Sequence, residues 1–246
     1  MNNPTHPKYL AFAGALLALT AHQATAQIQY STGHIDIGVA YEGGEWDLHI
    51  HDEELDIEYE PTELYFHGSE TNSSNFKLTA PGAGAFSFLG ASGDDVYIFP
   101  QVEDTGLPFI GIAAEENVLG DFIGGFTLNM VSLSGPGDFF MYQTDGFGEP
   151  TVHFDSSDGF DSSDVFSLNI GSHAHANFAF TQAGIYTVGI TATGTPNTAM
   201  PMESVSPTAF YTFGVNQVVP EPSAYALIAG LVGIGLVGAR RRRRRV

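Results

Sequence analysis

The chain has 246 residues, no cysteine and a formal net charge of −20 at pH 7. Between residues 27 and 219 a single lysine, Lys77, stands against 27 acidic residues, which gives that segment a formal charge of −26. Such a surface repels phosphate backbones and excludes nucleic acid as an expected partner. Without cysteine, a secreted domain has no disulfides and depends on its hydrophobic core or on bound ions.

Residues 1–26 have the pattern of a secretory signal peptide handled by the Sec machinery. Lys8 supplies the positive charge, and Leu10–Leu19 is an apolar run too short to span a bilayer. Ala24-Thr25-Ala26 offers the small residues of a cleavage site, so cleavage is expected before Gln27. An uncleaved anchor is the alternative.

Residues 28–52 alternate between apolar and polar side chains, which predicts a β-hairpin. A two-residue loop at Gly43-Gly44 suits the positive φ angles of a tight turn. That loop would place three apolar pairs on one face: Tyr41 with Trp46, Val39 with Leu48, and Ile37 with Ile50. The same register displays four polar residues on the other face: His34, Asp36, His49 and His51.

Short apolar runs separated by Gly, Pro, Asn and Asp continue along the chain, and no amphipathic helix is expected before residue 222. Strands are expected at 64–66, on both sides of a turn within 86–100, and at 122–133, 139–143, 166–170, 177–180, 185–193 and 209–215. The segments 52–63, 105–111 and 195–207 are expected to be loops or edges. Residues 27–216 are therefore predicted to form one all-β domain, an antiparallel β-sandwich like an immunoglobulin or jelly-roll fold.

The C-terminal segment, residues 217–246, has three parts: Pro220-Glu221-Pro222, seventeen uncharged residues at 223–239, and arginines from Arg240 to Arg245. As a helix the uncharged run is about 25 Å long, slightly short of a bilayer core, and the arginines should stay cytoplasmic. This order resembles the PEP-CTERM sorting signal of exopolysaccharide-producing Gram-negative bacteria. The resemblance implies recognition by an exosortase and cleavage near residues 220–222. The signal then consists of Pro220, Glu221 and Pro222 together with the arginines, among them Arg240, Arg241 and Arg242. A permanent transmembrane helix is the alternative.

Two His-x-His motifs, His49 with His51 and His173 with His175, are the strongest candidates for chemistry. Residues i and i+2 of a strand point to the same face, so each pair can offer two imidazoles together. Zinc takes three or four ligands, and Asp36, His34 or His153 could complete the set. The alternative interpretation is an outward-facing polar strand with no ligand.

Other motifs are weaker. Residues 151–164 include Asp155, Asp158, Asp161 and Asp164 at three-residue spacing, which is not the pattern of an EF-hand. A turn-rich loop is expected there, with an ion site as the alternative. An HExxH helix, a Gly-x-Ser-x-Gly elbow and a nucleophilic cysteine are all missing from the sequence. We therefore do not expect an enzyme.

The segments 33–54, 88–116, 134–143 and 154–195 resemble the choice-of-anchor M domain, a relative of the actinobacterial surface-anchored repeat. The stretch GSHAHANFAFTQAGIYTV, from Gly171, is the most specific part. The chain departs from the family at Tyr97, where Trp is typical, and within the GIAAEE segment, where Thr is frequent. Relatives often occur near zinc or manganese uptake genes, and similar periplasmic proteins bind zinc, so the resemblance implies a metal role.

Together these features predict an exported protein, transiently anchored in the inner membrane by its C-terminal helix alone and then placed in the envelope, at the surface or outside the cell. It would capture or buffer zinc through the two histidine pairs, with manganese or calcium as alternative ions. The second hypothesis is a non-catalytic matrix protein that associates with exopolysaccharide and has no metal role.

Overall fold

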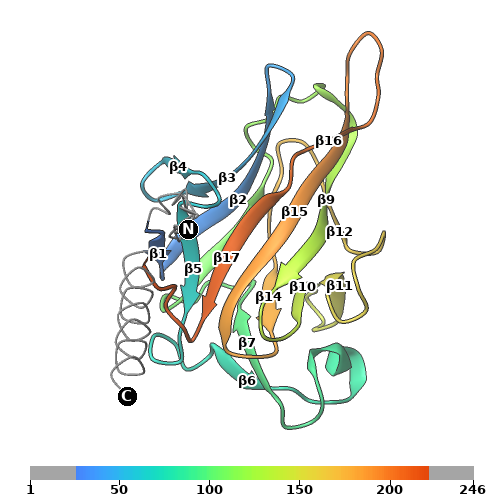
Figure 1. The fold of residues 1–246 in the computed structure, drawn as a ribbon. Helices are drawn as coiled ribbons and strands as arrows, with labels where there is room; N and C mark the ends of the chain where they lie inside the picture. Colours follow the sequence, from blue (N-terminus) through green and yellow to red (C-terminus); the bar gives the residue numbers. More distant parts are fainter. Residues whose placement is uncertain (1–25, 222–246) are drawn as a thin grey trace, which may run out of the picture.

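The computed structural model describes residues 26–221, which fold into three β-sheets with strands of very different length (Figure 1). The first sheet contains, in order, β1 (Ile28–Tyr30), β5 (Leu64–Gly68), β17 (Ala209–Val215), β15 (Gly184–Pro196), β9 (Phe122–Ser134) and β12 (Val165–Leu168), with β16 (Ser204–Val205) paired to β15. The second contains β11 (Pro150–Asp155), β10 (Phe139–Thr144), β14 (Asn177–Phe180), β7 (Asp95–Phe99) and β6 (Lys77–Thr79). The third contains β13 (His173–His175), β8 (Pro108–Ala113), β2 (Gly33–Glu42), β3 (Glu45–Asp52) and β4 (Ile57–Tyr59).

The expectation of an all-β domain is confirmed, but the expectation of wholly antiparallel pairing is wrong. Three pairs are parallel: β1 with β5, β5 with β17, and β2 with β8. A tight turn forces its two strands to be antiparallel, whereas these partners are joined by long connections that leave either direction open. The more detailed immunoglobulin-like or jelly-roll-like topology stays a prediction.

The β2–β3 hairpin has the predicted register. Tyr41 pairs with Trp46 and Ile37 with Ile50, and the turn residues Gly43 and Gly44 have φ angles of 61° and 95°. One expectation about the hairpin is wrong, however. Its polar face is not displayed to solvent, because Asp36 and His49 on that face are buried.

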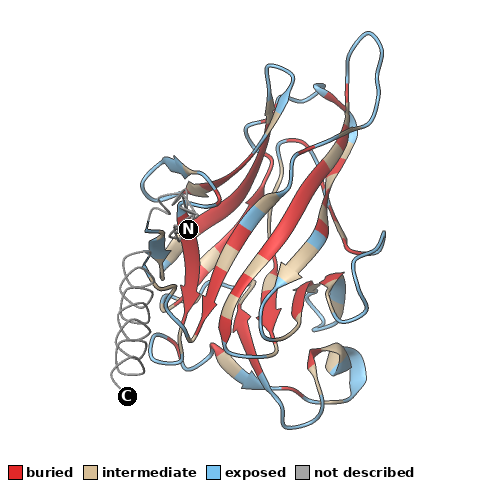
Figure 2. Cartoon of the chain, in the orientation of Figure 1, coloured by how far each residue is buried: buried red, intermediate tan, exposed pale blue. Residues whose placement is uncertain are grey.

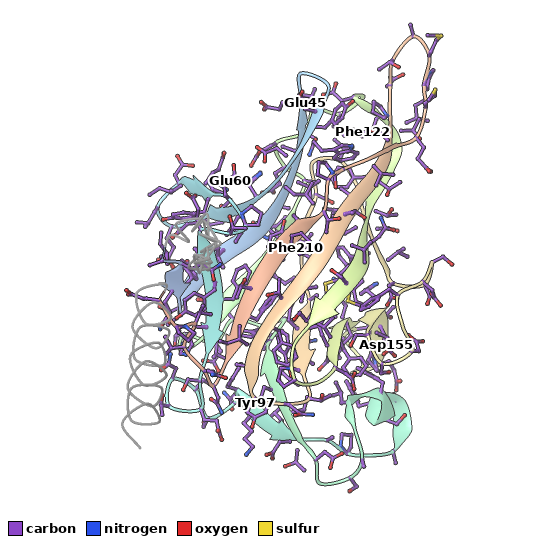
Figure 3. All side chains as sticks on the ribbon, viewed as in Figure 1. Glu45, Glu60, Tyr97, Phe122, Asp155 and Phe210 are labelled. Atoms are coloured by element: carbon purple, nitrogen blue, oxygen red, sulfur yellow. The ribbon has the colours of Figure 1, made fainter. Side chains whose placement is uncertain are left out.

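The tip of this hairpin packs against the first sheet through aromatic side chains. Tyr41 and Trp46 lie 5.2 and 5.3 Å from Phe122 between ring centroids. Figure 3 shows Glu45, beside the turn, and Phe122 at the same end of the molecule. The contact fixes the third sheet relative to β9.

Several other segments differ from the sequence-based expectation. Residues 84–89 form a 3-10 helix, η1 (Gly84–Leu89), where a strand was expected, because Gly84 and Gly90 adopt positive φ angles at its ends. Phe88 then packs against Phe140 of the second sheet. Residues 105–111 were expected to form a loop, but residues 108–113 form β8 inside the third sheet. Strands also form in two other expected loops: β11 includes residues 151–155, and β16 lies within 195–207.

Most buried residues lie along the strands, and the loops are exposed (Figure 2). Phe213 of β17 is at the centre of the core, with ring centroids 5.0 Å from Phe66 of its own sheet and 5.9 Å from Phe99 of the second sheet. Phe139, Phe178 and Phe180 of the second sheet surround it further. The two sheets therefore share one aromatic core.

The predicted signal peptide lies outside the described residues except for its last position, Ala26. Of the predicted sorting signal, Pro220 and Glu221 are described and have no regular structure, whereas Pro222 and the arginines lie outside. Within residues 26–221 no helix is long and apolar enough to cross a membrane.

Candidate metal centre

Strand pairing places the predicted histidines in two rows across one face of the third sheet. In the first row, Asp36 of β2 pairs with His51 on one side and with Gly111 on the other, and Gly111 pairs with His175. The second row consists of His49, Gly38, Ala113 and His173. Laterally paired residues point to the same face. The two His-x-His motifs thus share a face, but β2 and β8 separate them, and the structure does not bring the four histidines together.

Three histidine rings gather at the β13 end of this face. His34 of β2 stacks on His173 with 5.1 Å between ring centroids, and His175 lies 5.0 Å from His34 and 4.7 Å from His173. One nitrogen of each ring lies within 4.8 Å of the other two. We call His34, His173 and His175 the three-histidine cluster. All three are among the residues predicted from the sequence.

Asp36 lies against the three-histidine cluster and is fully buried. Its Oδ1 atom accepts a hydrogen bond of 3.1 Å from Nε2 of His173 and lies 3.2 Å from Nε2 of His34. Burial raises the pKa of the Asp36 carboxyl, Glu53 nearby raises it further, and His173 and His34 oppose the rise. A buried carboxylate is costly unless positive charge compensates it, so this position favours a cation.

Two polar atoms at this position make no hydrogen bond of regular geometry with residues 26–221: Nε2 of His34, despite its contact with Oδ1 of Asp36, and Oδ2 of Asp36. Buried polar groups in folded proteins almost always have a partner. One atom belongs to the three-histidine cluster and the other to the carboxylate that contacts it, and both are good metal ligands. Their lack of partners therefore points to a ligand at this site.

His175 is held in the orientation of a metal ligand. Its Nδ1 donates a 3.0 Å hydrogen bond to the backbone carbonyl of Ile110, and its ring stacks on Phe109 at 3.6 Å between centroids. A hydrogen bond of this kind fixes the tautomer that leaves the Nε2 lone pair free. Burial, more than the neighbouring histidines, lowers the pKa of His175 to about 4. The ring is thus neutral at ordinary pH, as a metal requires.

A glycine lies beneath this group. A Cβ atom at Gly111 would contact Oδ1 of Asp36 and Nε2 of His173. The space into which both side chains lean exists because residue 111 has no side chain. Gly111 was not among the predicted site residues, because an isolated glycine in a short apolar run indicates a loop.

The distances from Asp36 to two of the three histidines match the spacing of ligands around a small tetrahedral ion. With zinc–ligand bonds of about 2.0–2.1 Å, neighbouring ligand atoms of a tetrahedron lie about 3.3–3.4 Å apart. Oδ1 of Asp36 already lies 3.1 and 3.2 Å from the nitrogens of His173 and His34. The described residues thus offer three imidazoles, two of which contact the carboxylate of Asp36.

The upstream histidine pair has acidic neighbours instead. Nε2 of His49 lies 3.0 Å from Oε1 of Glu116, and His51 lies 3.0 Å from Glu53 and 3.4 Å from Asp56. Glu116 was not singled out from the sequence, because one carboxylate among so many acidic residues carries no signal.

Asp164, His153 and His67 lie elsewhere in the fold. Asp164 is buried and accepts hydrogen bonds from the backbone amides of Asp155 and Asp161, so it closes the acidic loop that follows β11. His153 contacts Gln143 in the second sheet, and His67 contacts Gln29 in the first.

Comparisons of the chain with protein-family models, with curated proteins and with solved structures found no match. The case for a function therefore depends on the geometry of the third sheet.

Proposed function

We propose that this is an exported metal-binding protein that holds one zinc ion through His34, His173, His175 and Asp36. The observation that carries the proposal is the cluster of three imidazoles, two of which contact the buried carboxylate of Asp36. Nε2 of His34 and Oδ2 of Asp36 also have no hydrogen-bond partner within the described residues. Asp36 supplies negative charge where burial makes it costly, and a divalent ion offsets that cost.

The ligand types favour zinc over the alternative ions. Imidazole suits zinc and copper, whereas calcium and manganese prefer sites made of oxygen ligands. Thiolates, which make the most tightly closed zinc sites, are absent from the sequence. Four protein ligands leave no open position for a substrate water, so the site fits binding rather than catalysis.

The cellular role in this proposal is capture or buffering of zinc at the cell envelope or surface. It is supported by the signal-peptide pattern of residues 1–26, by the likeness of residues 217–246 to a PEP-CTERM signal read by an exosortase, and by the resemblance to the choice-of-anchor M domain. A surface with so many acidic residues also attracts cations.

Zinc should stabilise the fold. At a free zinc concentration about 100 times Kd, we expect the free energy of unfolding of the full-length untagged chain to rise by about 2.7 kcal/mol, because the ion binds the folded state. Chemical unfolding with and without zinc measures this, and a chelator should reverse the effect. An unfolding curve that zinc does not move would contradict the proposal.

Gly111→Ala should weaken zinc binding by at least about tenfold, because the new Cβ displaces Asp36 and His173 from their positions. The fold itself should lose about 1–3 kcal/mol, the usual cost of one added methyl group in a tight space. Calorimetric zinc titration measures the affinity. Gly146→Ala is the matched control, since a Cβ there meets nothing within 4 Å. Equal zinc affinity in the two variants would mean that the ion does not bind above Gly111.

A further inference from the structure

A second group of possible ligands lies on the same face of the third sheet. His49 of β3, Glu58 of β4 and Glu116, which follows β8, each place one ligand atom within 4.8 Å of the other two. They share no residue with the three-histidine cluster. Three separate elements thus bring one imidazole and two carboxylates to one point.

His49 is the buried member of this group, with 4% of its surface exposed. Its imidazole lies directly over Gly38, where a Cβ atom would contact the ring, so the absence of a side chain at residue 38 makes room for it. Its Nε2 faces Glu116 at 3.0 Å. Nδ1 on the other side of the ring is buried and has no hydrogen-bond partner in the described part of the chain.

The unpartnered nitrogen suggests how the ring would respond to an ion. Oδ1 of Asp47 lies 3.9 Å from Nδ1 of His49, and the Asp47 side chain is exposed and free to approach. If Nε2 binds a metal, Nδ1 carries the proton and Asp47 can accept it in a hydrogen bond. A carboxylate, a histidine and a metal in this order are a common arrangement in metalloproteins.

We propose that His49, Glu58 and Glu116 form a second divalent-cation site, distinct from the three-histidine site. Two of its three protein ligands are carboxylates, so it should accept manganese as well as zinc. Both glutamates are exposed and must be ordered when the ion binds, which makes the site weaker and its ion more exchangeable. Water would complete the coordination.

The two sites are close enough to influence each other. Gly38 and Gly111, which lie under them, are on adjacent parallel strands and offset by two residues. Strand spacing of about 4.8 Å and a rise of about 3.3 Å per residue put the two glycines about 8 Å apart. Two divalent ions at such a distance repel each other, so filling the three-histidine site should further weaken the second.

The test titrates the full-length untagged chain with zinc alone and, separately, with manganese alone, the latter followed by the electron paramagnetic resonance signal of free manganese. We expect two zinc ions per chain with different affinities. Glu116→Gln should weaken the second site by at least about tenfold and leave the first unchanged. Glu115→Gln, which removes the same charge from the neighbouring position, should change neither. Thermal unfolding of each variant checks that it is folded.

The outcomes separate this proposal from the previous one. Two zinc ions, with only the weaker affinity and the manganese affinity sensitive to Glu116→Gln, would support the second site. A single zinc ion that depends on His175 and not on Glu116 would overturn the second site and leave the first. A single zinc ion that depends on Glu116 and not on His175 would overturn the three-histidine site and leave the second site. Binding of neither metal would overturn both.

Discussion

His175→Ala is expected to weaken zinc binding by more than about 100-fold. The substitution removes one of four proposed ligands, whereas loss of a residue that merely orients a ligand already costs about 10–100-fold. His175 is the ligand whose orientation is best defined, through its hydrogen bond to Ile110 and its stacking on Phe109. Competition against a zinc indicator of known affinity measures the loss.

His153→Gln is the matched control. It also removes one histidine, but this ring lies in the second sheet, where Nε2 contacts Gln143. We expect its zinc affinity to equal that of the unmodified chain. If both substitutions lowered the affinity to the same small extent, zinc would be binding to scattered surface groups and the three-histidine site would be rejected.

Phe213→Ala should lower the free energy of unfolding by about 3–5 kcal/mol, the usual loss when a buried phenylalanine is truncated in a core. The fully enclosed ring contacts Phe66 in its own sheet and Phe99 and Phe180 in the second sheet, so the resulting cavity would open between the two. Denaturant unfolding in the presence of a chelator measures this loss without any contribution from metal.

Phe210→Ala, three residues earlier on β17, provides the comparison. Phe210 points to the outer face, where 46% of its surface is exposed (Figure 3), and its loss should cost less than about 1 kcal/mol. Similar losses in the two variants would show that Phe213 is not the centre of the shared core.

Local features of the fold could be predicted because they depend on neighbouring residues. Gly43 and Gly44 set the turn, and the turn set every pair of the β2–β3 hairpin. Pairings between distant segments have no comparable signal in the local sequence. β8 contains Pro108 and Gly111, which suggest a loop, yet it pairs in parallel with β2 because its apolar residues complete the core.

The candidate site could be predicted only in part for the same reason. The alternation of β2, β3 and β13 placed the histidines and Asp36 on strand faces, and the structure does place them on one face. The order of strands decided which histidines would be neighbours. Because β8 lies between β2 and β13, His34 meets His173 and His175, whereas the upstream pair meets glutamates.

Asp36 and His173 are 137 residues apart in the sequence, yet they are in contact. An ion held between them would act as a reversible cross-link that closes most of the domain into a single loop. In the chain-entropy treatment, a permanent link across about 100 residues disfavours the unfolded chain by about 4.7 kcal/mol. In the extracellular setting proposed above, a cysteine-free protein would thereby gain the benefit of a disulfide without oxidation, and its lifetime among proteases would follow the local supply of free zinc.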